Sequence, residues 1–243
     1  MAPRPARGAR SAEASEPAAP FTLLKLRFLA CLLSLALLPV LRPAAALDLG
    51  RLQASMEKLG GNPQSLLAWK KLLQDHQDGS TQDKLHEVNA FFNQRIEFGT
   101  DPDIWGQADY WATPMETLAK GKGDCEDYVI AKYFTLLGMN IPDAQLRLIY
   151  VNARIGSPTR HIQQAHMVLA YYATADADPL ILDNLVTEIR PAGLRPDLQP
   201  IFSFNSQGVF AGVGGNAKLA PGGTSRLSRW HDLLQRAQQE GFD

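Results

Sequence analysis

The run GKGDCEDY, residues 121–128, places one cysteine among three carboxylates. Cys125 precedes a segment with helical periodicity, so its thiol would stand at a helix N-terminus, where the macrodipole and free backbone N–H groups favour the thiolate. A thiolate is the nucleophile of cysteine hydrolases and acyl transferases. The flanking Asp124, Glu126 and Asp127 oppose its formation, because nearby negative charges raise the pKa of a thiol. The run therefore holds a candidate nucleophile whose charged surroundings need an explanation.

A base and a group to orient it stand further along the chain. His166 lies in the apolar segment AHMVLAYY (165–172), and Asp183 lies in LILDNL (180–185). The ATADADP between the two has the composition of a turn, which predicts an antiparallel pair of strands that brings His166 and Asp183 together. A carboxylate in an apolar strand is costly unless it is paired. Together with Cys125, these residues match the nucleophile, base and orienting group of a catalytic triad.

Two explanations account for the carboxylates beside the cysteine. Asp124 suits a helix N-cap, and Asp127 three residues later completes a capping-box-like arrangement. Alternatively, the acids bind a divalent cation that offsets their charge, and hard oxygen ligands favour Ca²⁺ over Zn²⁺. Three contiguous acids cannot all point one way from a helix start, so a cation needs other ligands too. The candidates outside the run are Asp109, Asp143 and Asn152. The residues alone leave both explanations open.

Helical patterns dominate the first half of the sequence after residue 46, and strand patterns dominate the second. The segments with apolar residues at helical spacing are 52–59, 63–77, 81–94, 115–119 and 125–138, the last closed by Gly138 as a C-cap. The segments typical of strands are 145–151, 166–172 and 180–185. His161 falls in an expected loop, whereas His166 starts a strand. The other histidines, His76, His86 and His231, are expected on solvated surfaces.

The first 46 residues differ in composition from the rest. Arginine and lysine residues precede an apolar stretch at 28–41, and Ala44-Ala45-Ala46 gives a cleavage signal before Leu47. The apolar stretch falls short of the ~18 residues of a membrane span, which disfavours an uncleaved anchor. We therefore expect residues 1–46 to be a signal peptide. The mature chain, 47–243, is expected in a bacterial periplasm without stable membrane insertion.

Export changes how the cysteines are interpreted. Cys31 lies within the expected signal peptide, so Cys125 would have no partner for an internal disulfide. In an oxidising compartment such a cysteine is buried, pairs between chains, or is a working thiol. The presence of His166 and Asp183 favours the working thiol. The formal net charge of −1 over 243 residues gives no sign of a nucleic-acid-binding surface.

The sequence resembles the bacterial transglutaminase-like cysteine proteinases, most nearly the LapG-type periplasmic proteases that control biofilm adhesins. The resemblance rests on DYWATPMETLAKGKGDCEDYVIAKYFTLLGM (109–139), AHMVLAYY and LILDNL, and VNAFFNQRIEF (88–98) also fits. It implies a papain/transglutaminase-like α+β fold with one cysteine-protease domain. In that fold a mainly helical lobe, 47–140, carries the nucleophile at a helix N-terminus and packs on an antiparallel β lobe, 141–205. The tail, 206–243, with a terminal helix, is not covered.

The resemblance also implies a function. It assigns the triad to Cys125, His166 and Asp183, and it implies calcium dependence, with carboxylate ligands matching at Asp124, Glu126 and Asp127. The implied activity is that of a periplasmic endopeptidase that cleaves the N-terminal region of a large repeat-containing surface adhesin and so promotes biofilm release. The implied regulator is the periplasmic domain of an inner-membrane, LapD-like cyclic-di-GMP receptor.

Two other functions stay open at this level. The same triad could transfer the acyl group to an amine instead of water, as transglutaminases do, and no residue decides between these acceptors. The chain could also be a non-enzymatic calcium-binding partner domain with an incidental cysteine. Rapid iodoacetamide labelling of Cys125 that slows on loss of His166 would distinguish the enzymes from the binding module.

Overall fold

The computed structural model describes residues 47–157, 159–215, 217–220 and 227–242. The expected signal peptide, 1–46, lies outside the described residues. Within the described part of the chain, no helix combines the length and the apolar character needed to cross a membrane.

Helices form most of the described chain before residue 140, as the periodicity predicts. They are α1 (Leu49–Lys58), α2 (Pro63–His76), α3 (Thr81–Arg95), α4 (Asp101–Trp105), α5 (Pro114–Lys120) and α6 (Cys125–Gly138). A further helix, α7 (Ser228–Glu240), follows the strands. Side-chain caps fix several starts: Asn62 accepts from the N–H of Gln64, and Ser80 accepts from that of Asp83. The short α4 lies in a stretch without periodicity and was not predicted.

Helix α6 is the central element of this helical lobe. Every residue from Glu126 to Leu136 is buried, so the helix is enclosed on all sides rather than along the single apolar stripe that its sequence suggests. The reason is its position between α3 and the sheet. Its end also differs from the prediction: Asn140, with φ 65°, takes the left-handed conformation after the helix, whereas Gly138 is the last helical residue. A side chain at Gly138 would collide with Leu47.

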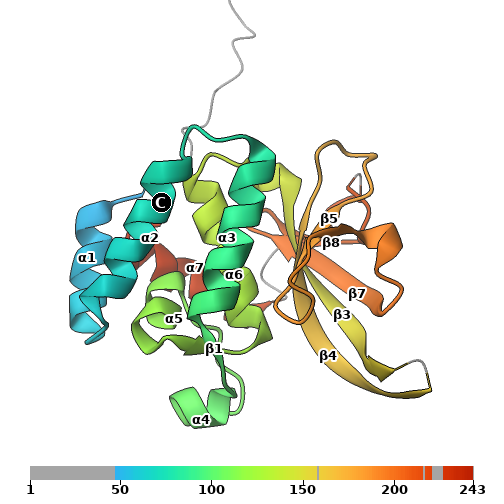
Figure 1. Ribbon diagram of the computed structural model, residues 1–243, viewed down its shortest axis with the longest axis horizontal. Helices are drawn as coiled ribbons and strands as arrows, with labels where there is room; N and C mark the ends of the chain where they lie inside the picture. The colour runs from blue at the N-terminus through green and yellow to red at the C-terminus, as the bar shows by residue number, and fades with distance from the viewer. Residues whose placement is uncertain (1–46, 158, 216, 221–226, 243) are drawn as a thin grey trace, which may run out of the picture. The chain divides into compact units, whose positions relative to one another are not determined.

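The sheet has the strand order β6-β5-β4-β3-β7-β8, and its neighbours are all antiparallel. The strands are β3 (Leu146–Ser157), β4 (Arg160–Tyr171), β5 (Leu180–Leu182), β6 (Arg190–Pro191), β7 (Leu198–Asn205) and β8 (Gly208–Phe210). The hairpin of β3 and β4 is longer than predicted, so His161 belongs to a strand rather than a loop, and His166 lies within β4 rather than at its start. In Figure 1 this hairpin projects from the sheet at the lower right.

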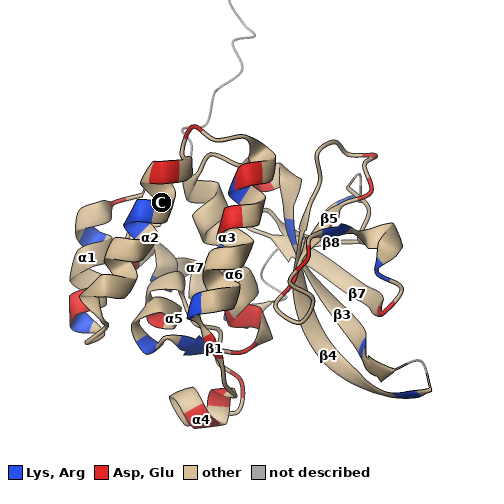
Figure 2. Ribbon diagram, viewed as in Figure 1, with Lys and Arg blue, Asp and Glu red and all other residues tan. Residues whose placement is uncertain are grey.

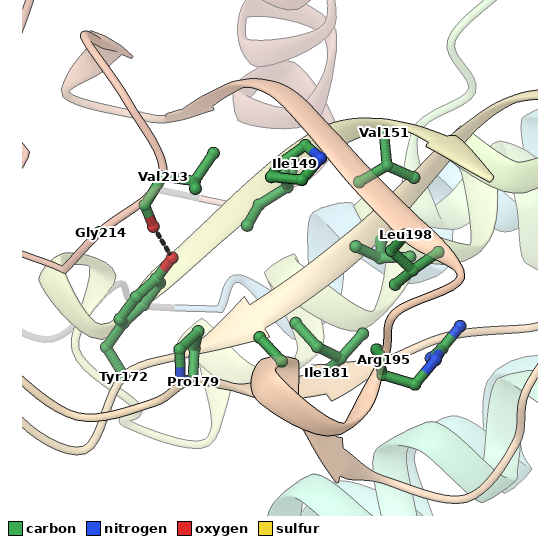
Figure 3. A pocket seen from close by; sticks show the side chains of 12 residues that line it. Ile149, Val151, Tyr172, Pro179, Ile181, Arg195, Leu198, Val213 and Gly214 are labelled. Carbon is green, nitrogen blue, oxygen red and sulfur yellow. Dashed lines mark hydrogen bonds between the residues drawn. The ribbon is translucent and has the colours of Figure 1, made fainter.

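Each face of the sheet buries its own apolar cluster. The larger cluster joins one face to the helices and contains Leu148, Leu169 and Phe204. The smaller cluster, on the opposite face, contains Ile149, Val168 and other side chains. Beside it lies a cavity of about 230 Å³, drawn in Figure 3, whose wall includes Arg195. The alternation of buried residues along β3 and β4 is thus explained by two covered faces.

The C-terminal helix α7 is tied to the segment that precedes the cysteine helix. Trp230 is fully buried among aromatic rings, including those of Trp111 and Phe204. Arg236 Nη2 donates to the backbone carbonyl of Trp111 at 2.6 Å. Thr113, the N-cap of α5, donates through Oγ1 to Glu240 Oε1 at 2.8 Å.

These elements confirm the predicted class, a helical lobe packed on an antiparallel sheet. A small parallel pair, β1 (Glu97–Phe98) and β2 (Lys122–Gly123), adds to it at the start of α6. This pair holds the residues before Cys125 against the end of α3, and so fixes where the cysteine helix begins.

Candidate active site

Cys125 is the first residue of α6 and is partly exposed. Its Sγ is 3.0 Å from Oε2 of Glu126, to which the thiol donates a hydrogen bond. The backbone N–H of Met167, on β4, also faces Sγ and favours the thiolate. Burial and the charges of Glu126 and Asp124 outweigh this contact and raise the pKa of the thiol well above its usual range. With these charges uncompensated, the thiol stays protonated at neutral pH.

His166 and Asp183 lie together at the end of the sheet beside Cys125. The His166 Nε2 and Asp183 Oδ1 atoms are 2.8 Å apart, and both side chains are buried. Oδ1 also accepts the N–H of Leu185 at 3.0 Å, whereas Oδ2 accepts from Arg195 Nη2 at 2.7 Å. Burial alone would raise the pKa of Asp183, but the bonds to His166 and Arg195 lower it to about 2. The carboxylate is therefore ionised throughout the neutral range.

Arg195 is a residue of this site that the sequence did not reveal. It lies after β6, is 4% exposed, and joins Asp183 to Asp197. Its Nη2 donates to Asp197 Oδ2 at 2.7 Å as well as to Asp183. In the sequence, the run Arg195-Pro-Asp197 has only the composition of a turn. The signal that could have identified it is the uncompensated Asp183, which needs a second partner besides His166.

A cavity of about 440 Å³ joins the candidate nucleophile to the candidate base. Cys125 and His166 both line it, along with Asp124 and Glu126 at the start of α6. Among the described contacts, the thiol hydrogen bond is directed to Glu126 and not to His166. Because the imidazole uses Nε2 for Asp183, Nδ1 is the nitrogen left for the thiol.

An acidic cluster adjoins Cys125 on the helical side. Oxygens of Asp101 and Asp109 lie within 4.8 Å of one another and of a Glu126 oxygen, and oxygens of Asp101, Asp124 and Asp127 form a similar group. Figure 2 shows the acidic residues of α4 as red segments of the ribbon at the bottom of the view. Asp109, a candidate from the sequence, thus lies in the cluster. Asp101, which the sequence did not single out, lies at its centre.

The carboxylates of this cluster are incompletely paired. Asp101 Oδ1 and Asp124 Oδ1 are buried and have no hydrogen-bond partner among the described residues. Burial, and then the charges of Glu126, Asp127 and Asp101, raise the pKa of Asp124. Burial raises the pKa of Asp101 as well. Two buried carboxylate oxygens without donors, among acids that repel one another, form a donor set that suits a hard divalent cation such as Ca²⁺.

The remaining candidate ligands have other partners. Asp127 Oδ1 accepts the N–H of Ala112 at 2.8 Å, and Oδ2 accepts that of Asp124 at 3.4 Å, the return bond of a capping box. Asp124 and Asp127 thus form the capping box that the sequence suggests at the start of α6, although Asp124 Oδ1 has no partner among the described residues. Asp143 lies elsewhere, where it accepts from the hydroxyls of Tyr133 and Ser206 at 2.6 Å. Asn152 belongs to β3 and does not line the cavity.

Comparison with known proteins agrees with the fold described above. The family model of the bacterial transglutaminase-like cysteine proteinases (BTLCP) matches residues 70–193. Among solved structures, Legionella pneumophila LapG has a TM-score of 0.65 and 36% identity, over 80% of this chain and 99% of that chain. Its calcium-bound form has a TM-score of 0.63 and 38% identity, over 77% of this chain and 98% of that chain. Its EGTA-treated form has a TM-score of 0.67 and 35% identity, over 80% of this chain and 100% of that chain. No curated protein sequence matches the chain at a significant level.

Proposed function

The chain belongs to the bacterial transglutaminase-like cysteine proteinases, and since it is therefore a cysteine protease, we propose that Cys125, His166 and Asp183 hydrolyse its peptide substrate. The observation that carries this assignment is the 2.8 Å bond between His166 and Asp183 beside a cavity that Cys125 also lines. A nucleophile at a helix N-terminus, a base and an ionised orienting group are the parts that acyl-enzyme hydrolysis requires.

The proposed reaction uses the two nitrogens of His166 differently. Nε2 stays bonded to Asp183, and Nδ1 takes the thiol proton of Cys125. Sγ then attacks the substrate carbonyl carbon, and the backbone N–H of Cys125 stabilises the oxyanion. Collapse breaks the C–N bond, and His166 returns the proton to the leaving amine. Water, deprotonated by the same imidazole, hydrolyses the thioester and restores the thiol.

We further propose that the acidic cluster holds Ca²⁺, with Asp101, Asp109, Asp124 and Glu126 as its carboxylate ligands. The unpartnered oxygens of Asp101 and Asp124 support this. When bound, the cation supplies positive charge that offsets the carboxylates around the thiol and so lowers its pKa. Asp127 keeps its backbone bonds and contributes at most one oxygen.

The substrate and partner are proposed from similarity to LapG. The substrate is the N-terminal region of a large repeat-containing surface adhesin, cut in the periplasm after removal of residues 1–46. Its cleavage promotes biofilm release. A LapD-like inner-membrane receptor for cyclic-di-GMP binds the protease through its periplasmic domain and withholds it from the adhesin. Co-purification of the two periplasmic domains, and inhibition of cleavage by the receptor domain, would support this partner.

The test of the triad is cleavage of an adhesin N-terminal fragment by purified protein. Cys125→Ala and His166→Ala should each abolish cleavage, whereas His161→Ala, five residues earlier on β4 and exposed, should keep it. Retention of more than a few per cent of activity by either triad variant would contradict the assignment. A parallel reaction with a primary amine separates hydrolysis from acyl transfer, because an amine adduct forms only in the second case.

The test of the cation uses the same fragment. EGTA should abolish cleavage by the wild type, and added Ca²⁺ should restore it. Glu126→Ala should cleave poorly even at high Ca²⁺, because it loses one ligand. Cleavage that is indifferent to EGTA would leave the acids as capping and surface residues.

A further inference from the structure

Strand β4 has an open edge immediately before His166. It pairs with β3 along its whole length, from Arg160 to Tyr171. On its other side, β5 pairs with it only from Leu169 to Tyr171. The six residues from Arg160 to Ala165 are all exposed, and Figure 1 shows that this part of the hairpin extends past its neighbouring strands. This stretch of β4 therefore presents backbone groups that no strand among the described residues uses.

The register identifies which residues direct their backbone to the open edge. The N–H of Tyr172 donates to the carbonyl of Gln145, on the β3 side, at 2.8 Å. Since the direction alternates along an antiparallel strand, Met167, Ala165 and Gln163 direct their N–H and C=O groups away from β3. Met167 agrees with this alternation, because its N–H faces Sγ of Cys125. The open edge thus begins at the candidate nucleophile and continues through Ala165 and Gln163.

The active-site cavity follows the same edge. Gln164, Ala165 and His166 form one wall of it, and Leu185 and Phe98 belong to the same lining. Leu185 is 47% exposed and Phe98 is 54% exposed, so the same cavity also offers apolar surface. Open edges are usually blocked by lysine, proline or a bulge. The sequence Gln163-Gln164-Ala165 contains neither lysine nor proline, and its pairing with β3 has no bulge.

We propose that the substrate binds as an extended strand added to this edge, with its backbone hydrogen-bonded to Ala165 and Gln163. This rests on the proposed protease function. One two-residue step along a strand is ~7 Å, so a peptide bonded at Ala165 places its next backbone unit beside Met167 and Cys125. Main-chain bonds then carry the affinity, and the enzyme selects segments that are extended and free of secondary structure. A folded repeat domain with satisfied backbone bonds is excluded.

A backbone methylation series tests this proposal. The ligand is a twelve-residue synthetic peptide labelled with fluorescein, and its binding to the Cys125→Ala protein is measured by anisotropy. Two alanines stand at its centre, because their small side chains leave the backbone accessible. Each peptide amide outside the central pair is N-methylated in turn. Methylation of alternate amides should weaken binding by about 2- to 12-fold, the value of one hydrogen bond. Methylation of the intervening amides, which face away, should have little effect. A series without this period of two would overturn the proposal.

A pair of proline variants provides a matched control in the protein. Ala165→Pro removes an N–H that faces the open edge, so the protein should keep its melting temperature within a few degrees but bind the peptide more weakly. Gln164→Pro removes an N–H that faces β3 and should lower the melting temperature instead. An Ala165→Pro protein that binds as tightly as its parent would contradict the proposal. If a proline variant fails to fold, the methylation series still tests the proposal, because it leaves the backbone of the protein unchanged.

The outcomes separate this proposal from the protease function. A period of two in binding, without cleavage of the unmodified peptide or of the adhesin fragment by the wild type, would retain the edge and refute the function. Cleavage of the substrate, without a period of two in the binding series, would retain the protease function and refute the role of the edge. If the edge instead pairs with a second copy of the chain, Ala165→Pro would convert a dimer to a monomer in sedimentation, and the substrate role of the edge would be wrong.

Discussion

The two halves of the candidate site differ in how far the polypeptide alone satisfies their charges. On the sheet side, Asp183 has a partner for each oxygen, and Arg195 is held in turn by Asp197. On the helical side, Asp101 and Asp124 each keep a buried oxygen without a partner among the described residues. The first half is fixed when the chain folds. By the proposal above, Ca²⁺ completes the second half, so that the folded chain would set the chemistry and the cation would control whether it proceeds.

The largest effect expected on this comparison comes from Asp183→Asn. An amide at this position can stabilise the wrong imidazole tautomer, which lowers kcat by roughly 10⁴-fold in serine protease triads. We expect a similar loss here with little change in KM. Steady-state kinetics on the adhesin fragment measure it, and a melting curve shows whether the fold persists. A folded variant within tenfold of wild-type kcat would remove Asp183 from the mechanism.

Arg195→Met should separate structure from catalysis in the same half. Removing one member of a buried ion pair costs about 3–5 kcal/mol, because the remaining charge is left without compensation. Urea unfolding at pH 7 should show this loss, and Arg195→Lys, which keeps the charge but not the bidentate geometry, should lose less.

The pH dependence gives a second readout of Arg195. The pKa of Asp183 is lowered in the folded state, so its contribution to stability is present above its unfolded value and is lost as the pH falls from about 4 towards 2. In Arg195→Met the folded pKa of Asp183 should rise towards its unfolded value, so this loss should be smaller and should end at a higher pH. Identical acid unfolding profiles for the two proteins would show that Arg195 does not hold the carboxylate.

Calcium should stabilise the helical half by a smaller amount. A ligand that binds only the folded state at 100 times its Kd adds about 2.7 kcal/mol, so Ca²⁺ should raise the melting temperature of the Cys125→Ala protein. Asp101→Asn should remove most of that rise. Asp103→Asn, an exposed acid on the same helix, should leave it intact. An equal rise in both variants would place the cation elsewhere.

The smallest effect concerns an unpartnered carboxylate outside the cluster. Burial raises the pKa of Glu240 to about 7, and its Oε2 has no hydrogen-bond partner among the described residues. Because the folded pKa exceeds the unfolded value, stability should fall as the pH rises from about 4.5 to about 7, and Glu240→Gln should abolish that fall. Urea unfolding of the two proteins at pH 5 and pH 8 measures this, and Glu240→Gln should be the more stable protein at pH 8. The calcium response should not change, because Glu240 lies outside the acidic cluster.

The sequence was most informative where a residue contradicted its own segment. Asp183 lies in an otherwise apolar segment and so required a polar partner. The predicted strand, turn and strand identified that partner as His166. Asp101 gave no such signal, because it lies in an irregular stretch whose path depends on α4 and the β1–β2 pair. Arg195 was missed for the same reason: it reaches Asp183 through tertiary packing after β6. The length of β4 was underestimated because Arg160 to Ala165 lack a buried face and so lack alternation.

The links between α7 and the segment before the cysteine helix have a consequence for the order in which the enzyme matures. Trp111 and Thr113, whose segment follows Asp109, are held by Arg236 and Glu240. A ribosome that has made the triad residues has not yet made these anchors. A partly synthesised or truncated chain therefore carries every catalytic side chain but lacks the anchors of this segment. We therefore expect this segment to take up its position only after α7 has been made.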